Sequence, residues 1–440
     1  MKSAALPGAE FLPRNDIERC QAEHWRAQAS YVSAQSVFYR TLLGGQALRG
    51  ELAEIKDLPF TDKEMLRADQ TAHAPFGSYL CADPKTISRL HRTSGTTGAA
   101  MNLALSVRDA DMTAEVGARA QRAAGLGPGH RVVHCLNYQL WMGGYTDHAI
   151  LERTGATVVP FGVGNSAKLV ETIGELGVTA ISCTPSYPAV LEQVIADEFP
   201  ELSPRDLGLR LGLFGGEAGL DDPAYRGRLE AVWGFAVRNA NYGVSDVLCN
   251  FASQTAECTD LHFMAEDVLY PELIDAASEA LLPWQEGESG ELVLTHLAKD
   301  CQPLVRFKTG DIVTLTGLGP AACGRTAPRF RVTGRADDMV TVRGLNVFPA
   351  MVAGVINQYS ELSGEYRIVL TGLPPYDVLP VELELAEGQG AAGAGLGEAI
   401  ERKIKQETGA TAEVTLRPPR SLPRTEGKTR RVIRQEGEHV

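Results

Sequence analysis

The stretch Thr93-Ser94-Gly95-Thr96-Thr97-Gly98 decides how the rest of this sequence is interpreted. A short strand with a basic edge is expected before it, over 86–92, and an apolar strand after it, over 101–106. Its glycines allow a tight turn, and the threonine and serine hydroxyls add donors that suit the oxygens of a polyphosphate. A polar β-turn explains the hexamer equally well, because the Gly-Lys-Ser/Thr ending and the following helix of a Walker A loop are missing.

Length and composition set the broad class. A chain of 440 residues is too long for one ordinary core, so two or more domains are expected. Its 44% hydrophobic and 22% charged residues are typical of a soluble globular protein. The net charge of −13 argues against nucleic acid or an anionic membrane as the main partner. No signal peptide or membrane span is visible, and the eight cysteines lack a Cys-x-x-Cys pair, so a cytoplasmic location is expected.

Strand and helix patterns alternate from residue 131 onward. Such alternation predicts parallel strands with helical crossovers, and therefore an α/β fold. The expected strands are 131–136, 156–159, 180–183, 209–214 and 236–241. Ligands bind beyond the carboxyl ends of such strands. The loops there are 137–144, 161–166, 184–187, 215–218 and 242–246, and they are rich in Gly, Tyr, Ser and Thr.

Three regions are expected along the chain. Residues 1–75 form helices, over 17–39 and 63–66, that pack on a large α/β lobe spanning 76–334. That lobe includes a β subdomain from about 263, with strands at 268–274, 290–295, 303–307 and 311–315. Residues 335–440 form a small C-terminal α/β lobe. Its expected strands are 366–370, 381–385 and 413–416, its helix is 398–407, and its Gly/Ala-rich loop is 388–397.

Six motifs in order resemble those of the phenylacetate–CoA ligase family of the adenylate-forming superfamily. They are the phosphate loop at 93–98, an adenine-side loop at 214–218, Tyr-Gly-Val-Ser-Asp at 242–246, Arg-Phe-Lys-Thr-Gly-Asp at 306–311, a hinge region at 334–349, and a lysine segment at 423–428. Each motif alone is weak. Their order over most of the chain from about residue 60 makes the resemblance specific.

This resemblance implies a two-step reaction. A carboxylate attacks the α-phosphate of ATP to give an acyl-adenylate and pyrophosphate, and the acyl group then passes to the thiol of CoA. Negative charge gathers at phosphorus, so cations and donors already in place lower the barrier. The resemblance assigns this catalytic role to Lys428, with Arg335 and Thr97 beside it. Without the resemblance, Lys428 would be interpreted as a solvated lysine of a basic tail.

The resemblance also places the nucleotide. Asp311 carries two acceptor oxygens for the ribose diol, although an ordinary Gly-Asp turn is the alternative. Tyr242 offers a flat face to adenine, and Asn241 can bind its amino edge. Asp246 is the implied Mg²⁺ ligand, at a position where the family usually has Glu. The other implied nucleotide-binding residues are Thr93, Ser94, Gly95, Thr96, Gly98, Gly216, Glu217, Ala218, Gly243 and Ser245.

Two further positions concern the second step. In the family, the small lobe is mobile and turns about a hinge between two poses, and Asp337 is the matching residue. Gly344 would let the pantetheine arm of CoA pass close to the backbone, although it can also be a simple turn glycine.

The acid is expected to be aromatic. Tyr138, Trp141, Phe161, Tyr187 and Gly215 lie in the loops after the parallel strands, and aromatic walls with small residues between them fit a flat ring. Most single aromatic residues belong to a core, so the loop positions carry this prediction. No Arg or Lys occurs between residues 138 and 144, so the far end of the acid is expected not to be anionic.

The sequence departs from the family at several positions. The Lys-Pro pair that often follows the phosphate loop is Ala99-Ala100, and the glutamates expected after residue 349 are Ala353 and Gly354. Some relatives hold a structural zinc. Here Cys258, His262 and Cys323 remain, which predicts a degraded site unless Cys301 or Cys249 supplies a fourth ligand.

Other functions stay open at this stage. One alternative keeps adenylation but delivers the acyl group to a carrier-protein thiol or an amine. A non-catalytic binding relative is a further alternative, against which the retained Lys428, Asp311 and Arg335 argue. The acid, the acceptor and the oligomeric state, including a homodimer, are not fixed by the sequence.

Overall fold

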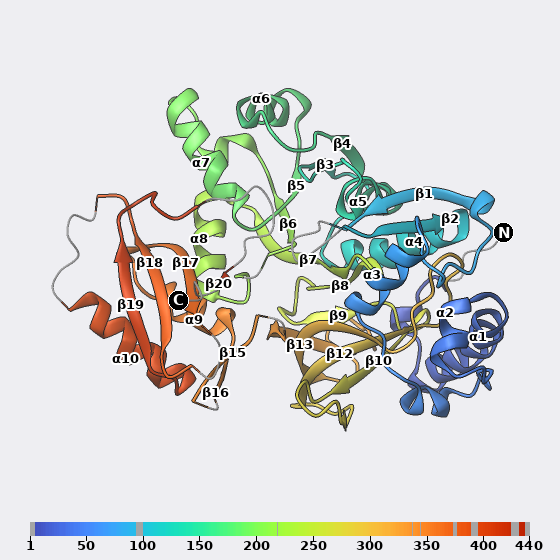
Figure 1. Cartoon of the computed structure of the whole chain (residues 1–440). Helices are drawn as coiled ribbons and strands as arrows, with labels where there is room; N and C mark the ends of the chain where they lie inside the picture. The colour runs from blue at the N-terminus through green and yellow to red at the C-terminus, as the bar shows by residue number, and fades with distance from the viewer. Residues whose placement is uncertain are drawn as a thin grey trace. The chain divides into compact units, whose positions relative to one another are not determined.

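A computed structural model describes most of the chain (Figure 1). The described residues are 5–93, 100–217, 219–336, 338–343, 345–372, 376–388, 395–423 and 431–435, without the side chains of 346 and 350. The chain divides into two compact units. The large unit comprises Met1–Gly215, Val232–Thr309 and Val313–Arg331, and the small unit comprises Gly216–Ala231, Gly310–Ile312 and Val332–Val440.

The N-terminal region is helical, as predicted. It contains η1 (Ala9–Phe11), α1 (Arg14–Gln35), α2 (Val37–Leu42), η2 (Leu52–Asp57), α3 (Lys63–Ala72) and η3 (Pro84–Thr86). The single helix expected over 17–39 is wrong, because Ser36 has an extended backbone between α1 and α2. The Ser36 hydroxyl instead accepts a hydrogen bond from the Tyr39 backbone N–H and caps α2.

The parallel strands form one half of a large sheet. They are β3 (Arg131–His134), β4 (Thr157–Pro160), β5 (Ala180–Cys183), β6 (Leu211–Gly215) and β7 (Ala236–Val244). Each adjacent pair is parallel, which confirms the α/β prediction. The intervening helices are α5 (Met142–Arg153), α6 (Ser166–Leu176), α7 (Tyr187–Glu198), η4 (Pro204–Leu207) and α8 (Pro223–Trp233). Since β7 continues through Val244, the loop expected from residue 242 begins later.

Antiparallel strands continue the same sheet. They are β8 (Leu248–Ser253), β9 (Leu261–Phe263), β10 (Leu269–Ile274), β11 (Leu281–Leu282), β12 (Ser289–His296), β13 (Phe307–Gly317) and β14 (Arg329–Arg335). The strand order of the whole sheet is β11-β10-β12-β13-β14-β9-β8-β7-β6-β5-β3-β4, and Figure 1 shows β10, β12 and β13 side by side. The predicted strand at 311–315 lies within β13. The one predicted at 303–307 is wrong, because residues 303–306 form no strand and β13 begins at Phe307.

Strands β1 (Ile87–Arg92) and β2 (Asn102–Ser106) pair as an antiparallel hairpin, and they precede and follow the phosphate-loop sequence. Helix α4 (Val107–Ala123) follows directly. Its cap is Ser106, as expected, and Asp109 completes a capping box. Residues 94–99 lie outside the described residues.

The small unit has its own mixed sheet. Its elements are β15 (Val340–Val342), β16 (Leu345–Val347), α9 (Pro349–Ile356), β17 (Leu362–Thr371), β18 (Leu379–Leu385), α10 (Leu396–Thr408), β19 (Ala412–Arg417) and β20 (Val432–Gln435). The strand order of this sheet is β19-β18-β17-β20. The core of the unit includes Ile368, Leu383 and Ile400. Helix α10 begins inside the loop expected over 388–397, and residues 389–394 of that loop lie outside the described residues.

A buried ion pair ties α4 to the turn after β9 in the large unit. The Arg119 guanidinium donates to both carboxylate oxygens of Asp267, at 2.8 and 2.9 Å, and both side chains are almost fully buried. Arg119 also donates to the carbonyl oxygens of Met264 and Leu6. This bidentate pair leaves few donors unused, which a buried charge requires.

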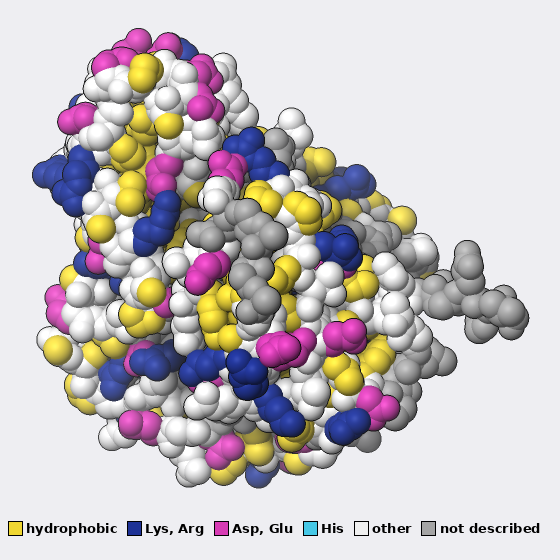
Figure 2. Space-filling view, turned by 90° about the vertical axis from the view of Figure 1, so that its left-hand side faces the viewer, with side chains coloured by type: hydrophobic (Ala, Val, Ile, Leu, Met, Phe, Trp, Pro, Cys, Tyr) yellow, Lys and Arg dark blue, Asp and Glu magenta, His cyan; other side chains and the backbone are white. Residues whose placement is uncertain are grey.

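The surface carries mixed charge. Acidic and basic side chains are interspersed over the face that Figure 2 presents. Among the described residues, no helix combines the length and the apolar character that a membrane span needs.

Asp147 on α5 is a second buried polar residue that links elements of the large unit, here next to the parallel strands. Its carboxyl group accepts a hydrogen bond from Asn241 Nδ2 of β7 at 2.5 Å and contacts the Cys249 sulfur of β8 at 2.6 Å. Burial raises the pKa of Asp147 to about 7, although these two hydrogen bonds lower it. The carboxyl group is therefore largely neutral below neutral pH, while it would be ionised in the unfolded chain.

The shift predicts how stability depends on pH. Between pH 4 and pH 7 the folded chain keeps the Asp147 proton that the unfolded chain has lost, so stability falls as pH rises and levels off above about 7. Between pH 5 and pH 8, the unfolding free energy of the native protein should fall by about 2 kcal/mol more than that of Asp147→Asn. Urea unfolding of both proteins at the two pH values measures this difference. Equal losses in both would contradict the assignment.

Candidate active site

The candidate site begins at the carboxyl edge of the parallel strands in the large unit. The Gly162 N–H donates to the carbonyl oxygen of His134 at 2.9 Å, and the Cys135 N–H donates to that of Ser182 at 2.9 Å. These bonds hold the ends of β3, β4 and β5 together. The loops that follow them therefore open on one edge, where α/β sheets bind ligands.

The predicted aromatic residues are held by specific neighbours at this edge. Tyr138, Trp141, Phe161 and Tyr187 are all half-buried. The Tyr138 ring lies 5.5 Å from the His134 ring, and a side chain at Gly162 would lie 3.6 Å from Tyr138. Since Gly162 follows Phe161 directly, the structure brings Tyr138 close to the start of the Phe161 loop. The hydroxyl of Tyr187 is hydrogen-bonded to that of Ser166 at 3.0 Å.

Glycines allow close packing in the same region. A side chain at Gly143 would lie 2.7 Å from the Trp141 ring. One at Gly215 would lie 2.5 Å from the Asn241 carbonyl oxygen. Since real Cβ contacts do not approach this closely, neither position accepts a larger residue without a shift of its neighbours.

A set of polar side chains on α5 and β1 was not predicted. The Tyr138 hydroxyl is hydrogen-bonded to His148 Nδ1 at 2.9 Å, and His148 Nε2 lies 3.2 Å from Glu152. Burial lowers the pKa of His134 to about 4, and burial with the nearby Arg89 lowers that of His91 to about 4. The spacing of residues 148 and 152 on one helical face was visible in the sequence, but the contact with Tyr138 was not.

The nucleotide-side motif lies on β7 and the turn after it. Tyr242 is half-buried, and its ring meets those of Phe251 and Phe330 edge-on, each at 5.3 Å. A side chain at Gly243 would lie 2.0 Å from the Cys249 carbonyl oxygen, so β8 requires glycine there. Ser245 is half-buried in the same turn. The adenine contact predicted for Tyr242 and Asn241 stays a prediction.

Asp246, the predicted metal ligand, already has a cationic partner. Its Oδ2 accepts from Lys63 Nζ at 3.0 Å, and its side chain is 3% exposed. Its Oδ1 is buried and has no hydrogen-bond partner among the described residues. One unused carboxylate oxygen fits the way Mg²⁺ binds a nucleotide, through one or two carboxylates plus phosphates and water. The sequence could not predict Lys63, which lies far from Asp246 along the chain.

Asp311 and Arg335 form a close ion pair in the small unit. Arg335 Nη1 lies 2.6 Å from Asp311 Oδ1, and the Ala336 N–H donates to the Gly310 carbonyl oxygen at 2.7 Å. Gly310 has a positive φ of 76°, and a side chain there would lie 2.7 Å from Arg335 Nη2. Arg335 thus neutralises the carboxylate that is predicted to bind ribose.

Several predicted residues lie outside the described residues. They are Ser94, Gly95, Thr96, Thr97, Gly98, Ala218, Asp337, Gly344 and Lys428. Thr93 is described and buried, and its hydroxyl accepts from the Met101 N–H at 3.0 Å. Gly216 has a positive φ of 83°, which suits glycine, and Glu217 follows it.

The cysteines form no closed metal site within the described residues. Cys323 Sγ lies 3.8 Å from His262 Nε2, but no group of three His, Cys, Asp or Glu side chains that could hold a metal is found there. Cys249 contacts Asp147, and the Cys301 N–H donates to Asp109.

Known proteins resemble this chain along nearly all of its length. A match to the AMP-binding enzyme C-terminal domain family covers residues 344–435. A phenylacetate–coenzyme A ligase of Thermus thermophilus is 35% identical over 97% of this chain and 98% of its own length. One of Escherichia coli is 31% identical over 87% of this chain and 86% of its own length.

The fold of this chain is also similar to that of a CoA ligase whose structure has been solved. A 2-hydroxyisobutyryl-CoA ligase in a postadenylation state has a TM-score of 0.87 at 30% identity, over 98% of this chain and 92% of its own. The same ligase in its thioesterification state has a TM-score of 0.69 over equal shares. On the sequence identity and coverage of its relatives, this chain belongs to the phenylacetate–coenzyme A ligase family of adenylate-forming, acid–thiol ligases.

Proposed function

We propose that this chain activates an aromatic carboxylic acid, whose far end carries no charge, with ATP and transfers the acyl group to CoA. ATP, CoA and an acid are the substrates of its family. The observation that carries the aromatic assignment is the edge after β3, β4 and β5. There, Tyr138, Trp141 and Phe161 are half-buried, and Gly143, which lies against the Trp141 ring, has no room for a side chain. A flat apolar ring matches such walls.

The hydrogen bond between the Tyr138 hydroxyl and His148 Nδ1 gives Tyr138 a fixed position in this proposal. A ring whose hydroxyl is already paired is ordered before the acid arrives, so less entropy is lost on binding. Residues 138–144 contain no Lys or Arg that would pair with a second carboxylate. The acid is therefore proposed to carry a single carboxylate, the one that reacts.

In the first step, a carboxylate oxygen attacks the α-phosphorus of ATP, and the bond to the pyrophosphate oxygen breaks. We propose that Lys428 neutralises the charge that develops, and that Asp246 holds Mg²⁺ through its Oδ1, which has no hydrogen-bond partner among the described residues. Mg²⁺ would supply charge neutralisation at the phosphates. Tyr242 would face adenine, and Asp311, which pairs with Arg335, would bind ribose.

In the second step, the thiolate of CoA attacks the acyl carbon and AMP leaves. We propose that Asp337 is the hinge about which the small domain, residues 335–440, changes position between the steps, and that Gly344 admits the pantetheine arm. Support comes from the solved relative, which differs in structure between its postadenylation and thioesterification states. Both residues lie outside the described ones, so these roles rest on the resemblance.

Replacement of Lys428 tests the catalytic cation. Lys428→Ala should lower acid-dependent ATP–pyrophosphate exchange by about 10²- to 10³-fold, as loss of one transition-state donor does. Lys403→Ala is the matched control, because Lys403 pairs with Glu407 on α10, outside the predicted site, and its loss should leave full activity. Exchange that persists unchanged in Lys428→Ala would refute the assignment.

A substrate screen tests the acid and its acceptor. Benzoates, anthranilates, phenylacetates and indole acetates are offered with ATP, and CoA is added afterwards. A monocarboxylic aromatic acid should give pyrophosphate exchange and then acyl-CoA, and the same ring with a second carboxylate at its far end should react at least tenfold more slowly. Exchange without acyl-CoA would instead favour a carrier-protein thiol or an amine as acceptor. No exchange with any acid would favour a non-catalytic relative.

A further inference from the structure

A cluster of three polar side chains joins α5, β7 and β8 in the large unit. At its centre is Asp147, which is only 3% exposed. One of its carboxyl oxygens accepts a hydrogen bond from Asn241 Nδ2 at 2.5 Å, and the other accepts one from the Cys249 thiol at 2.6 Å. Burial raises the pKa of the Cys249 thiol well above its ordinary value, so the thiol keeps the proton that it donates. Both oxygens of Asp147 therefore have a donor.

This cluster lies beside residues that are predicted to line the acid site. A side chain at Gly215 would lie 2.6 Å from the Asn241 Cβ, so these two residues are in direct contact. Gly143, which packs against the Trp141 ring, precedes Asp147 by one turn on the same face of α5. The cluster therefore adjoins the acid side of the carboxyl edge of the sheet.

Packing alone gives no reason for an acid at position 147. A buried carboxyl group loses its hydration, and an apolar side chain of similar size usually costs less in such a place. No Lys, Arg or His among the described residues pairs with Asp147 to offset that loss. What Asp147 provides is a fixed acceptor, and the side chain that it orients is that of Asn241.

The hydrogen bond to Asp147 decides which end of the Asn241 amide is left for a ligand. A side-chain amide has a donor end and an acceptor end. The donor end is directed at Asp147, whereas no described residue donates a hydrogen bond to Asn241 Oδ1. Burial raises the pKa of Asp147 to about 7, so at about pH 8 its carboxylate is ionised and only accepts. The amide then cannot turn over without placing two oxygens against each other.

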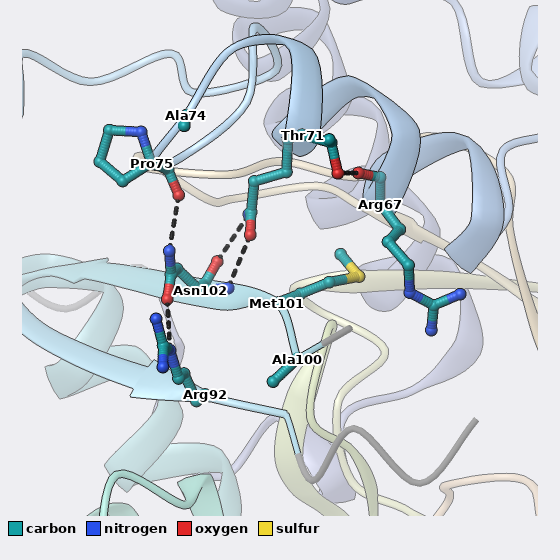
Figure 3. A pocket seen from close by; sticks show the side chains of 9 residues that line it. Arg67, Thr71, Ala74, Pro75, Arg92, Ala100, Met101 and Asn102 are labelled. Carbon is teal, nitrogen blue, oxygen red and sulfur yellow. Dashed lines mark hydrogen bonds between the residues drawn. The ribbon is translucent and has the colours of Figure 1, made fainter. Parts of the chain in front are cut away.

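Asn102 in the β1–β2 hairpin shows how a fully paired amide differs from that of Asn241. Asn102 Nδ2 donates to the Pro75 carbonyl oxygen at 2.8 Å, and its Oδ1 accepts from Arg92 Nε at 2.9 Å (Figure 3). Both ends of that amide are used within the protein. Asn241 is half-buried and has only its donor end used among the described residues, so its carbonyl oxygen is the group left to a ligand.

We propose that Asp147 is a positioning residue that holds Asn241 as an acceptor for an N–H or O–H donor on the ring of a bound ligand. An oxo group at that point of the ring would place oxygen against oxygen, and a methyl group would leave Oδ1 without a partner. Two ligands of the proposed reaction can bring such a donor. One is adenine, through its exocyclic amino group, and the other is the acid, through an amino or hydroxyl substituent. The second source rests on the proposed function.

Two variants of Asp147 separate its positioning role from its shape. Asp147→Leu has a similar size but no acceptor, so the Asn241 amide becomes free to present either end. Asp147→Asn keeps an oxygen that accepts from Asn241 Nδ2, and it is the matched control in which the native preference should be retained. Both variants are compared with the native protein at about pH 8, where Asp147 is ionised, and their unfolding midpoints are measured to show that they fold.

The first arm of the test measures the base. AMP and IMP are titrated calorimetrically into each protein without acid, since IMP has an oxo group where AMP has the amino group. If adenine brings the donor, IMP should bind about tenfold more weakly than AMP to the native protein and to Asp147→Asn. The ratio of the two Kd values should fall to about two in Asp147→Leu, because the amide can then present its donor end to the oxo group.

The second arm measures the acid. The amino- or hydroxyl-substituted aromatic acid that reacts fastest is compared with the same ring carrying a methyl group in that place. If the acid brings the donor, KM for the methyl compound should be about tenfold higher than KM for the substituted acid in the native protein and in Asp147→Asn. The ratio should fall to about two in Asp147→Leu, while kcat for the methyl compound stays the same.

The outcomes of the two arms decide the proposal together. A fall in one ratio, seen in Asp147→Leu and not in Asp147→Asn, supports the positioning role and assigns the donor to that ligand. Ratios that change in neither arm would overturn the role. It would also be overturned by an equal fall in Asp147→Asn, or by a fall in both ratios, which indicates a general loss of shape.

The positioning role and the proposed function fail separately. Titration with AMP and IMP needs no acid and no turnover, so it reports on Asp147 even if no acid supports exchange. Loss of acid-dependent exchange in the native protein would count against the proposed function alone. Should Asp147→Leu not fold, Asn241→Leu removes the acceptor directly and should lower the same ratio.

Discussion

The parallel pairing of β5, β6 and β7 is the constraint on which the candidate site depends. Parallel strands place their carboxyl ends at one edge, so loops that are distant in sequence meet there. Gly215 lies at the end of β6, directly against Asn241 of β7, and the approach is too close for a side chain. The acid-side and nucleotide-side motifs are thus adjacent because of backbone hydrogen bonds, and neither motif determines this by itself.

Buried polar groups then fix the side chains on that edge. Asp147 of α5 is hydrogen-bonded to Asn241, and Lys63 of α3 is hydrogen-bonded to Asp246. Helices from two parts of the chain therefore orient residues of β7 and the turn after it. Both carboxyl groups are almost fully buried, and one oxygen of Asp246 has no hydrogen-bond partner among the described residues. Such residues are ordered before a nucleotide binds, which is the condition for electrostatic catalysis.

The sequence was sufficient for the fold class and the family, because alternation and motif order are local patterns. The sequence was a less reliable guide where tertiary contacts decide the local structure. The break at Ser36 and the continuous strand β13 both override local signals. Lys63 beside Asp246 and His148 beside Tyr138 could not be predicted, since each contact joins elements whose proximity only the folded chain defines.

The most direct test is a crystal structure of the protein with ATP and the acid that gives the fastest exchange. The account predicts an acyl-adenylate at the carboxyl edge of the parallel strands β3 to β7, with adenine against Tyr242 and the acid ring beside Tyr138 and Phe161. A nucleotide bound away from that edge, or an acid ring that touches neither aromatic side chain, would contradict it.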